Sequence, residues 1–101
     1  MRVTLTIQYI GFQLKPRGRE YSYRVLNPKT EAREFTLTIS NQAFHERHFP
    51  FQDAASLCYQ KLERELTAET PEQPLRRHLT ISDQELDAYR EKYRPAKRRG
   101  V

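Results

Sequence analysis

His45 and His48 are the first candidates for metal chemistry, because both are histidines and they lie only three positions apart. A helical zinc-protease site instead places its histidines four residues apart with a glutamate beside the first, so that both imidazoles share one face. The other residues of ligand type, His78 and Cys58, are distant in the sequence. Because a zinc site needs several converging ligands, we expect neither a metal ion nor a cofactor, and histidines that are exposed or partly packed.

Cys58 is the only cysteine, which excludes an intramolecular disulfide and a zinc cage of several cysteines. A nucleophilic cysteine needs a neighbouring base and a lowered pKa. Cys58 lies instead between Leu57 and Leu62 among apolar residues at helical spacing, which predicts a buried structural thiol. The chain has no carboxylate pair, no nucleophile elbow and, with three glycines, no glycine-rich phosphate loop. These residues predict a protein that is not an enzyme.

The chain of 101 residues is long enough for one domain with one layer of core, and too short for a Rossmann or TIM-barrel enzyme. We expect a single domain over 1–94, a polar linker within it at 68–75, and a basic, disordered tail at 95–101. Interrupted apolar stretches fall far short of the roughly 20 residues needed to span a bilayer. The first residues alternate threonine with apolar side chains, unlike a signal peptide. A cytoplasmic protein without a membrane partner is expected.

Three segments alternate between apolar and polar residues with a period of two, at 2–10, 21–25 and 34–40. This alternation is typical of half-buried antiparallel strands. The sequence NPKT at 27–30 has proline at the second position of a turn and therefore predicts a hairpin between the second and third strands. The earlier connection, at 11–19, combines basic residues with glycine and proline, so we expect a mobile basic loop there.

The period changes after the third strand, and apolar residues then follow helical spacing, which predicts a helix over 53–67 with Asp53 as its N-cap. The expected fold is α+β, a three-stranded antiparallel sheet covered on one face by this helix and followed by a second short C-terminal helix. The predicted core consists of Val3, Leu5, Ile7, Tyr23, Val25, Phe35, Leu37, Ile39, Ala55, Leu57, Cys58, Leu62 and Leu66.

The second helix, predicted over 83–94, has clear signals at its beginning. Ser82 and Glu85 have the spacing of a capping box, and Ile81 and Leu86 that of a hydrophobic staple. Acidic residues crowd its first turn and basic residues its last, which favours the helix dipole. We expect this helix to dock at the end or edge of the sheet.

The chain is basic, with 18 lysines and arginines against 13 aspartates and glutamates and a net charge of +5. A basic loop and a basic tail favour binding to the phosphates of a nucleic acid by charge, without recognition of the base sequence. The first functional hypothesis is a small non-enzymatic binding module for an anionic partner, above all nucleic acid. The alternative for this charge is an ordinary solubilising surface. The candidate contacts are Lys15, Arg17, Arg19, Arg24, Arg94, Lys97, Arg98 and Arg99.

The expected elements do not match a specific nucleic-acid module. An RNA-recognition sheet exposes aromatic residues, whereas Tyr21, Tyr23 and Phe35 share the parity of the aliphatic residues and are predicted to point inward. The connection between the two helices is too long for a helix-turn-helix motif. Three strands followed by a helix resemble, at the level of fold, the later part of a double-stranded-RNA-binding domain. That family has a preceding helix and a lysine-rich start to its last helix, where this chain has FQD at 51–53, so no function is carried over.

Protein contact is the competing hypothesis, and it starts from the segment 41–51, which holds three phenylalanines. Phe44, Phe49 and Phe51 either close the open end of a small core or form an exposed surface for a partner.

The second helix and the first strand offer further contacts. Tyr89 and Tyr93 pack either on their own sheet or on a partner, and the second helix is a candidate for exchange between two copies. The strand 2–10 has few charges and is a candidate edge for pairing with the same strand of a second copy. The alternative function is therefore a protein–protein interaction or homodimerisation module.

Overall fold

The computed structural model describes residues 5–93, which form an α+β fold, as the sequence predicts. Strands come first along the chain, and the helices follow. The elements are β1 (Thr6–Lys15), β2 (Gly18–Asn27), β3 (Thr30–Ser40), α1 (Asn41–His45), α2 (Phe51–Ala68), β4 (His78–Thr80) and α3 (Asp83–Tyr93).

The sheet has four strands in the order β1-β2-β3-β4, so the prediction of three strands is wrong in number. The first three are antiparallel, whereas β4 runs parallel to β3 and makes the sheet mixed. The Thr36 N–H donates to the Arg77 carbonyl at 2.8 Å, and the Ile81 N–H donates to the Thr38 carbonyl at 2.9 Å. The sequence predicts only a short extended piece at 76–81, because a strand of three residues is too short to show the alternation that would assign it to the sheet.

The connection between β1 and β2 differs most from the prediction. Only Pro16 and Arg17 separate the two strands, so the expected mobile loop at 11–19 is wrong. Lys15 ends β1, and Arg19 lies within β2 opposite Leu14.

A β-bulge in β1 explains why the strand continues so far. Tyr9 pairs with Tyr23 and Gly11 pairs with Ser22, which leaves Ile10 as an extra residue. Gly11 has φ 154°, a conformation that glycine adopts readily and other residues rarely do. The extra residue shifts the alternation by one position, and a strict period of two therefore stops matching at this point.

The hairpin between β2 and β3 is as predicted. Asn27 pairs with Thr30 across the turn, and the Lys29 N–H donates to the Asn27 side-chain oxygen at 2.8 Å. This local hydrogen bond is one that asparagine commonly makes in turns, and Pro28 sets the backbone for it.

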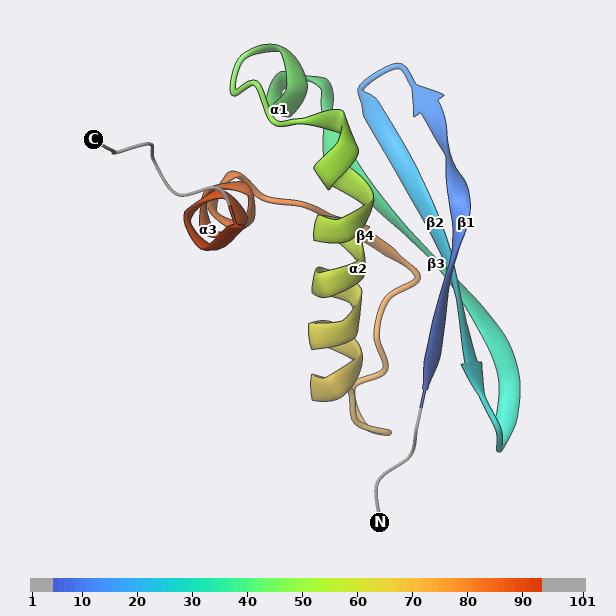
Figure 1. The fold of residues 1–101 in the computed structure, drawn as a ribbon. Coiled ribbons are helices and arrows are strands. Elements are labelled where there is room, and N and C mark those ends of the chain that lie inside the picture. The colour runs from blue at the N-terminus through green and yellow to red at the C-terminus, as the bar shows by residue number, and fades with distance from the viewer. Residues whose placement is uncertain (1–4, 94–101) are drawn as a thin grey trace.

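Helix α2 lies along one face of the twisted sheet, and α3 lies on the side of α2 away from β1 (Figure 1). The Tyr23 hydroxyl reaches across this interface and donates to the Ala55 carbonyl at 2.5 Å. Most of the predicted core is buried, including Cys58, which is fully inaccessible. In α2 the fully buried alanine is Ala54 and not Ala55, and Leu5 and Ile7 are only partly buried. Val3 lies outside the described residues.

The beginning of α2 corrects the predicted N-cap. Pro50 precedes the helix in an extended conformation, without a side-chain cap, and Asp53 lies in the first turn. Proline restricts the preceding residue, Phe49, to extended backbone. The helix therefore begins at Phe51 and extends to Ala68, slightly beyond the predicted 53–67 at both ends.

The phenylalanine-rich segment closes one end of the core. Phe44 and Phe49 are buried, with 7% and 2% of their surface exposed, whereas Phe51 is 53% exposed. The rings of Phe49 and Tyr89 lie 5.7 Å apart, so α3 packs on this closure. Of the two alternatives for the segment, two phenylalanines fill the core and one remains at the surface.

The capping box at the start of α3 is confirmed. The Ser82 N–H donates to the Glu85 carboxylate at 2.8 Å, and the Glu85 N–H donates to the Ser82 hydroxyl at 3.2 Å. Ile81 and Leu86, the predicted staple residues, are both buried. Helix α3 runs over Asp83–Tyr93 in place of the predicted 83–94.

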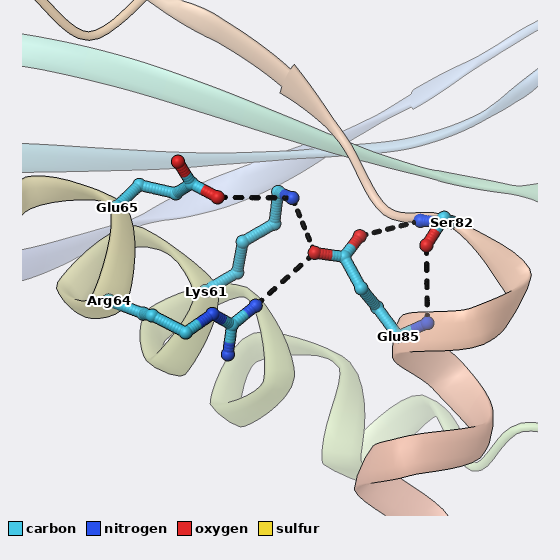
Figure 2. Close-up of polar contacts among 5 residues, drawn as sticks. All are labelled: Lys61, Arg64, Glu65, Ser82 and Glu85. Carbon is cyan, nitrogen blue, oxygen red and sulfur yellow. Dashed lines mark hydrogen bonds and ion pairs between the residues drawn. The ribbon is translucent and has the colours of Figure 1, made fainter. Parts of the chain in front are cut away.

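The Glu85 carboxylate also joins α3 to α2 (Figure 2). Figure 2 shows the Lys61 ammonium and the Arg64 guanidinium converging on one carboxylate oxygen, at 2.5 and 3.2 Å. Burial alone would raise the pKa of Glu85, but the hydrogen bonds from Lys61 and from the Ser82 N–H outweigh it, and the pKa is lowered. Lys61 is the one buried charged residue of the described core and owes its place to this carboxylate.

The segment predicted as a polar linker is bonded to the sheet. The Arg33 guanidinium makes two hydrogen bonds, at 2.8 and 3.1 Å, to the Glu69 carboxylate at the end of α2. The same carboxylate accepts the Leu75 N–H at 2.8 Å. The Arg33 guanidinium lowers the pKa of Glu69, because the positive charge favours the ionised carboxylate.

Candidate protein-interaction surface

Large apolar side chains are concentrated on β1, where the sheet ends. Four of the six large apolar residues exposed among those described belong to this strand: Tyr9 (47% exposed), Ile10 (53%), Phe12 (46%) and Leu14 (72%). We call these four residues the β1 surface. The strand TIQYIGFQLK has one charged residue, Lys15, at its end. Natural proteins usually protect such an edge with charges or proline.

The register of β1 explains the exposure. Tyr9 and Phe12 lie opposite Tyr23 and Tyr21 of β2, on the face that α2 covers. Both partners on β2 are buried, whereas Tyr9 and Phe12 remain about half exposed. Helix α2 therefore covers β1 only in part: Ile7 is partly buried, whereas Tyr9 and Phe12 stay exposed. Within residues 5–93, no strand pairs with the outer edge of β1.

Arg19 connects the β1 surface to the beginning of α2. Its guanidinium lies 4.0 Å from the ring centroid of Phe51, 4.9 Å from that of Phe12 and 5.4 Å from that of Phe44. Phe44 and Phe51 are themselves stacked, with centroids 4.6 Å apart. Cation–π attraction of this kind holds the three rings around one charge. Phe51 thus extends the exposed apolar area from β1 onto α2.

Tyrosines of β1 and β2 pack against the rings of this exposed apolar area. The ring of Phe12 stacks on Tyr21 at 5.5 Å, and the ring of Tyr9 lies 5.3 Å from Tyr23. Burial raises the pKa of Tyr21, and the nearby Arg19 guanidinium partly opposes that rise. These phenols therefore stay neutral at physiological pH.

A shallow, open groove of about 970 Å³ continues along the flank of α2. Tyr9 and Tyr23 of the sheet and Ala55 and Tyr59 of the helix line its apolar part. Tyr59 is 37% exposed, and its ring meets that of Tyr23 edge-on at 6.4 Å. The groove and the β1 surface adjoin at Tyr9.

Of the four described cations predicted to contact nucleic acid, three already have partners within the chain. Lys15 lies 3.9 Å from Glu20, Arg24 lies 3.0 Å from Glu34, and Arg19 is packed among aromatic rings. Arg17 occupies the exposed turn between β1 and β2. The remaining candidates lie outside the described residues: Arg94, Lys97, Arg98 and Arg99.

The predicted protein-interface residues are also divided. Phe51 is exposed as that hypothesis requires, but Phe44, Phe49 and Tyr89 are buried in the chain's own core. Tyr93 is the last residue of α3, and its side chain lies outside what the structure describes.

The sequence predicts the strand edge at 2–10, with Tyr9 and Ile10, as a candidate for pairing, but it does not predict that Phe12 and Leu14 continue this surface, because the apolar residues change parity after Ile10. A signal was available, since Phe12 and Leu14 resume the alternation on the even positions directly after Gly11. A glycine at such a shift is typical of a bulge.

The residues first considered for chemistry are dispersed. His45 and His48 are both exposed, and within residues 5–93 no three His, Cys, Asp or Glu side chains are grouped to hold a metal ion. Burial raises the pKa of the Cys58 thiol to about 12, which keeps it protonated. Among the described helices, none is long and apolar enough to cross a membrane.

Comparison with known proteins adds no further constraint. No family model, no curated protein and no solved structure matches this chain.

Proposed function

We propose that this chain is a non-enzymatic interaction module that binds a protein partner through the β1 surface. The observation that carries the proposal is a ten-residue strand edge that no other strand of the described residues pairs with, and that has four large exposed apolar side chains. Backbone hydrogen bonds along an edge strand supply affinity, and the side chains beside it supply specificity.

The packing around the β1 surface supports this function. Phe12 and Phe51 are held in place by Arg19, so part of the exposed area is ordered before a partner arrives. Ordering a contact surface in advance reduces the entropy lost on binding. Exposed aromatic side chains next to an arginine have the composition typical of interface centres.

Site-specific photo-crosslinking in cells that express the chain tests the proposal. One variant carries benzoylphenylalanine in place of Phe12, and the control carries it in place of Glu91, an exposed residue of α3. We expect a protein adduct from the Phe12 position that mass spectrometry identifies by sequence, and none from the Glu91 position. Absence of adducts at Phe12, or the same adducts at both positions, would overturn the proposal.

Nucleic-acid binding stays a prediction and is tested separately. It rests on the net charge of +5 and on the basic residues 94–99, which lie outside the described residues. Fluorescence anisotropy with short DNA and RNA at low and physiological salt is the suitable measurement. A chain ending at Tyr93 should lose affinity and salt dependence if the basic residues after it make phosphate contacts. Failure of the full chain to bind any of these probes at low salt would exclude the hypothesis.

A further inference from the structure

The ten residues of β1 have an almost palindromic arrangement about the point between Ile10 and Gly11. Ile7, Tyr9, Phe12 and Leu14 point toward the face that carries α2, because they lie opposite inward-facing residues of β2. The remaining positions belong to the outer face, where Ile10 lines a depression together with Gln8, Ser22 and Arg24. Read from either end, the order of inner and outer positions is the same.

Only the bulge makes this symmetry hold. In a regular strand, residues on either side of a midpoint between two positions point to opposite faces, because the side-chain period is two. The extra residue at Ile10 shifts the second half by one position, so both halves present the same faces.

We propose that β1 pairs antiparallel with β1 of a second copy of this chain, with a two-fold axis between Ile10 and Gly11. This inference rests on the proposed function and names its partner. Each copy would contribute its four strands to one continuous sheet, so that neither β1 edge remains open.

The side chains match in type as well as in direction. On the face of α2, Ile7 would meet the second copy's Leu14, and Tyr9 would meet the second copy's Phe12. Cross-strand aromatic pairs and pairs of large aliphatic residues stabilise antiparallel sheets. Both apolar contacts would occur twice because of the two-fold symmetry.

The outer face is equally compatible with pairing. Gln8 would lie opposite the second copy's Gln13, and two amides can exchange hydrogen bonds. Lys15 would lie opposite the second copy's Thr6, so no like charges face each other across the axis.

Gly11 fits the centre of this arrangement. A Cβ built at Gly11 meets no atom within 4 Å, so the space beside it is open. In the pairing, that space lies next to the second copy's Ile10, which is 53% exposed in the single chain. The residue with no side chain thus faces the one large apolar side chain on the outer face of the strand.

Sedimentation equilibrium of the full chain and two lysine variants tests the association. Leu14→Lys places a charge on the inner face of the pairing, and because Leu14 is 72% exposed the fold should survive, which circular dichroism verifies. Ala88→Lys adds the same charge at an exposed position of α3 and is the matched control. We expect a dimer for the native chain and the control, and a dissociation constant raised at least about tenfold by Leu14→Lys.

Cysteine cross-linking tests the register. Gln8→Cys and Gln13→Cys chains, mixed and oxidised mildly, should form a disulfide between the two variants, because directly opposed Cβ atoms lie within reach of a disulfide. Gln8→Cys alone should not cross-link, since the two copies of position 8 would be separated by five residues, or about 17 Å. The native Cys58 is fully buried and does not interfere.

The outcomes separate this inference from the proposed function. A monomer at all concentrations would overturn pairing between copies in this register. Cross-linking of Gln8→Cys alone to the same extent as the mixture of Gln8→Cys and Gln13→Cys chains would overturn it as well. If Phe12 then still cross-links a different protein in cells, the interaction module stands with another occupant. If Phe12 cross-links nothing, the proposed function itself fails.

Discussion

Replacing Glu85 by glutamine should destabilise the chain, because it removes the charge that neutralises a buried lysine. The Lys61 ammonium lies 2.5 Å from the Glu85 carboxylate, and its side chain is only 11% exposed. Glutamine is a suitable capping-box residue, so the hydrogen bonds with Ser82 can persist while the charge is lost. The substitution therefore isolates the ion pair from the helix cap.

The magnitude follows from the degree of burial. Removing one partner of a fully buried ion pair costs about 3–5 kcal/mol. Here Glu85 keeps 21% of its side chain exposed, and Glu65 remains 3.8 Å from the Lys61 ammonium. We therefore expect a loss near that of one charged hydrogen bond, about 2 kcal/mol. For a domain of this size the melting temperature should fall by about 10 °C.

Thermal and urea unfolding followed by circular dichroism measure this loss. Glu91→Gln, at an exposed position of the same helix, is the control and should change stability by less than about 0.5 kcal/mol. Lys61→Met combined with Glu85→Gln should be less destabilising than the sum of the two single changes, because no buried charge is left unpaired. Equal melting temperatures for Glu85→Gln and the native chain would refute the reasoning from the ion pair.

Three further stability predictions follow from the core, an ion pair and a close backbone contact. Leu37→Ala removes a fully buried side chain and should cost about 2–5 kcal/mol in urea unfolding, so unchanged stability would contradict the strand assignment. Glu69 has a lowered pKa beside Arg33, so the stability that this ion pair contributes is present above the unfolded-state pKa of about 4.3. It is lost as the pH falls through the folded-state pKa. Glu69→Gln should therefore flatten the acid limb of a stability–pH curve; an unaltered limb would exclude this carboxylate as its source. At Gly18 an added Cβ would lie 2.2 Å from the Ile39 carbonyl, so Gly18→Ala should cost about 1–3 kcal/mol in melting experiments, and a neutral outcome would show that this contact can relax.

Local signals account for the elements that the sequence predicts correctly. The turn at 27–30 and the capping box of Ser82 and Glu85 depend on residues within four positions of one another. The inward direction of Tyr23 and Phe35 depends on an uninterrupted period of two. Such signals do not require knowledge of distant segments.

The errors arise where a local pattern is interrupted or where distant segments meet. The bulge at Ile10 ended the simple alternation, and the basic residues around Pro16 were then assigned to a loop. The short strand β4 is defined by its pairing with β3, which lies about forty residues earlier in the chain, and not by its own alternation. Arg19 was assigned to phosphate binding by charge alone, although its aromatic neighbours come from separate elements.

The sequence by itself determined the fold class, the hairpin, the two long helices and the inward face of β2 and β3, because hydrophobic period, caps and turns act over a few residues. Only the tertiary structure decided that α2 covers β2 but leaves Tyr9 and Phe12 exposed, and that Phe44 is buried while Phe51 is not. Burial depends on how segments distant in the chain pack against one another, and a local sequence pattern carries no information about that packing. The edge at 2–10 was already a candidate for pairing from the sequence, but only the packing of the helix beside it decided which of its side chains are exposed.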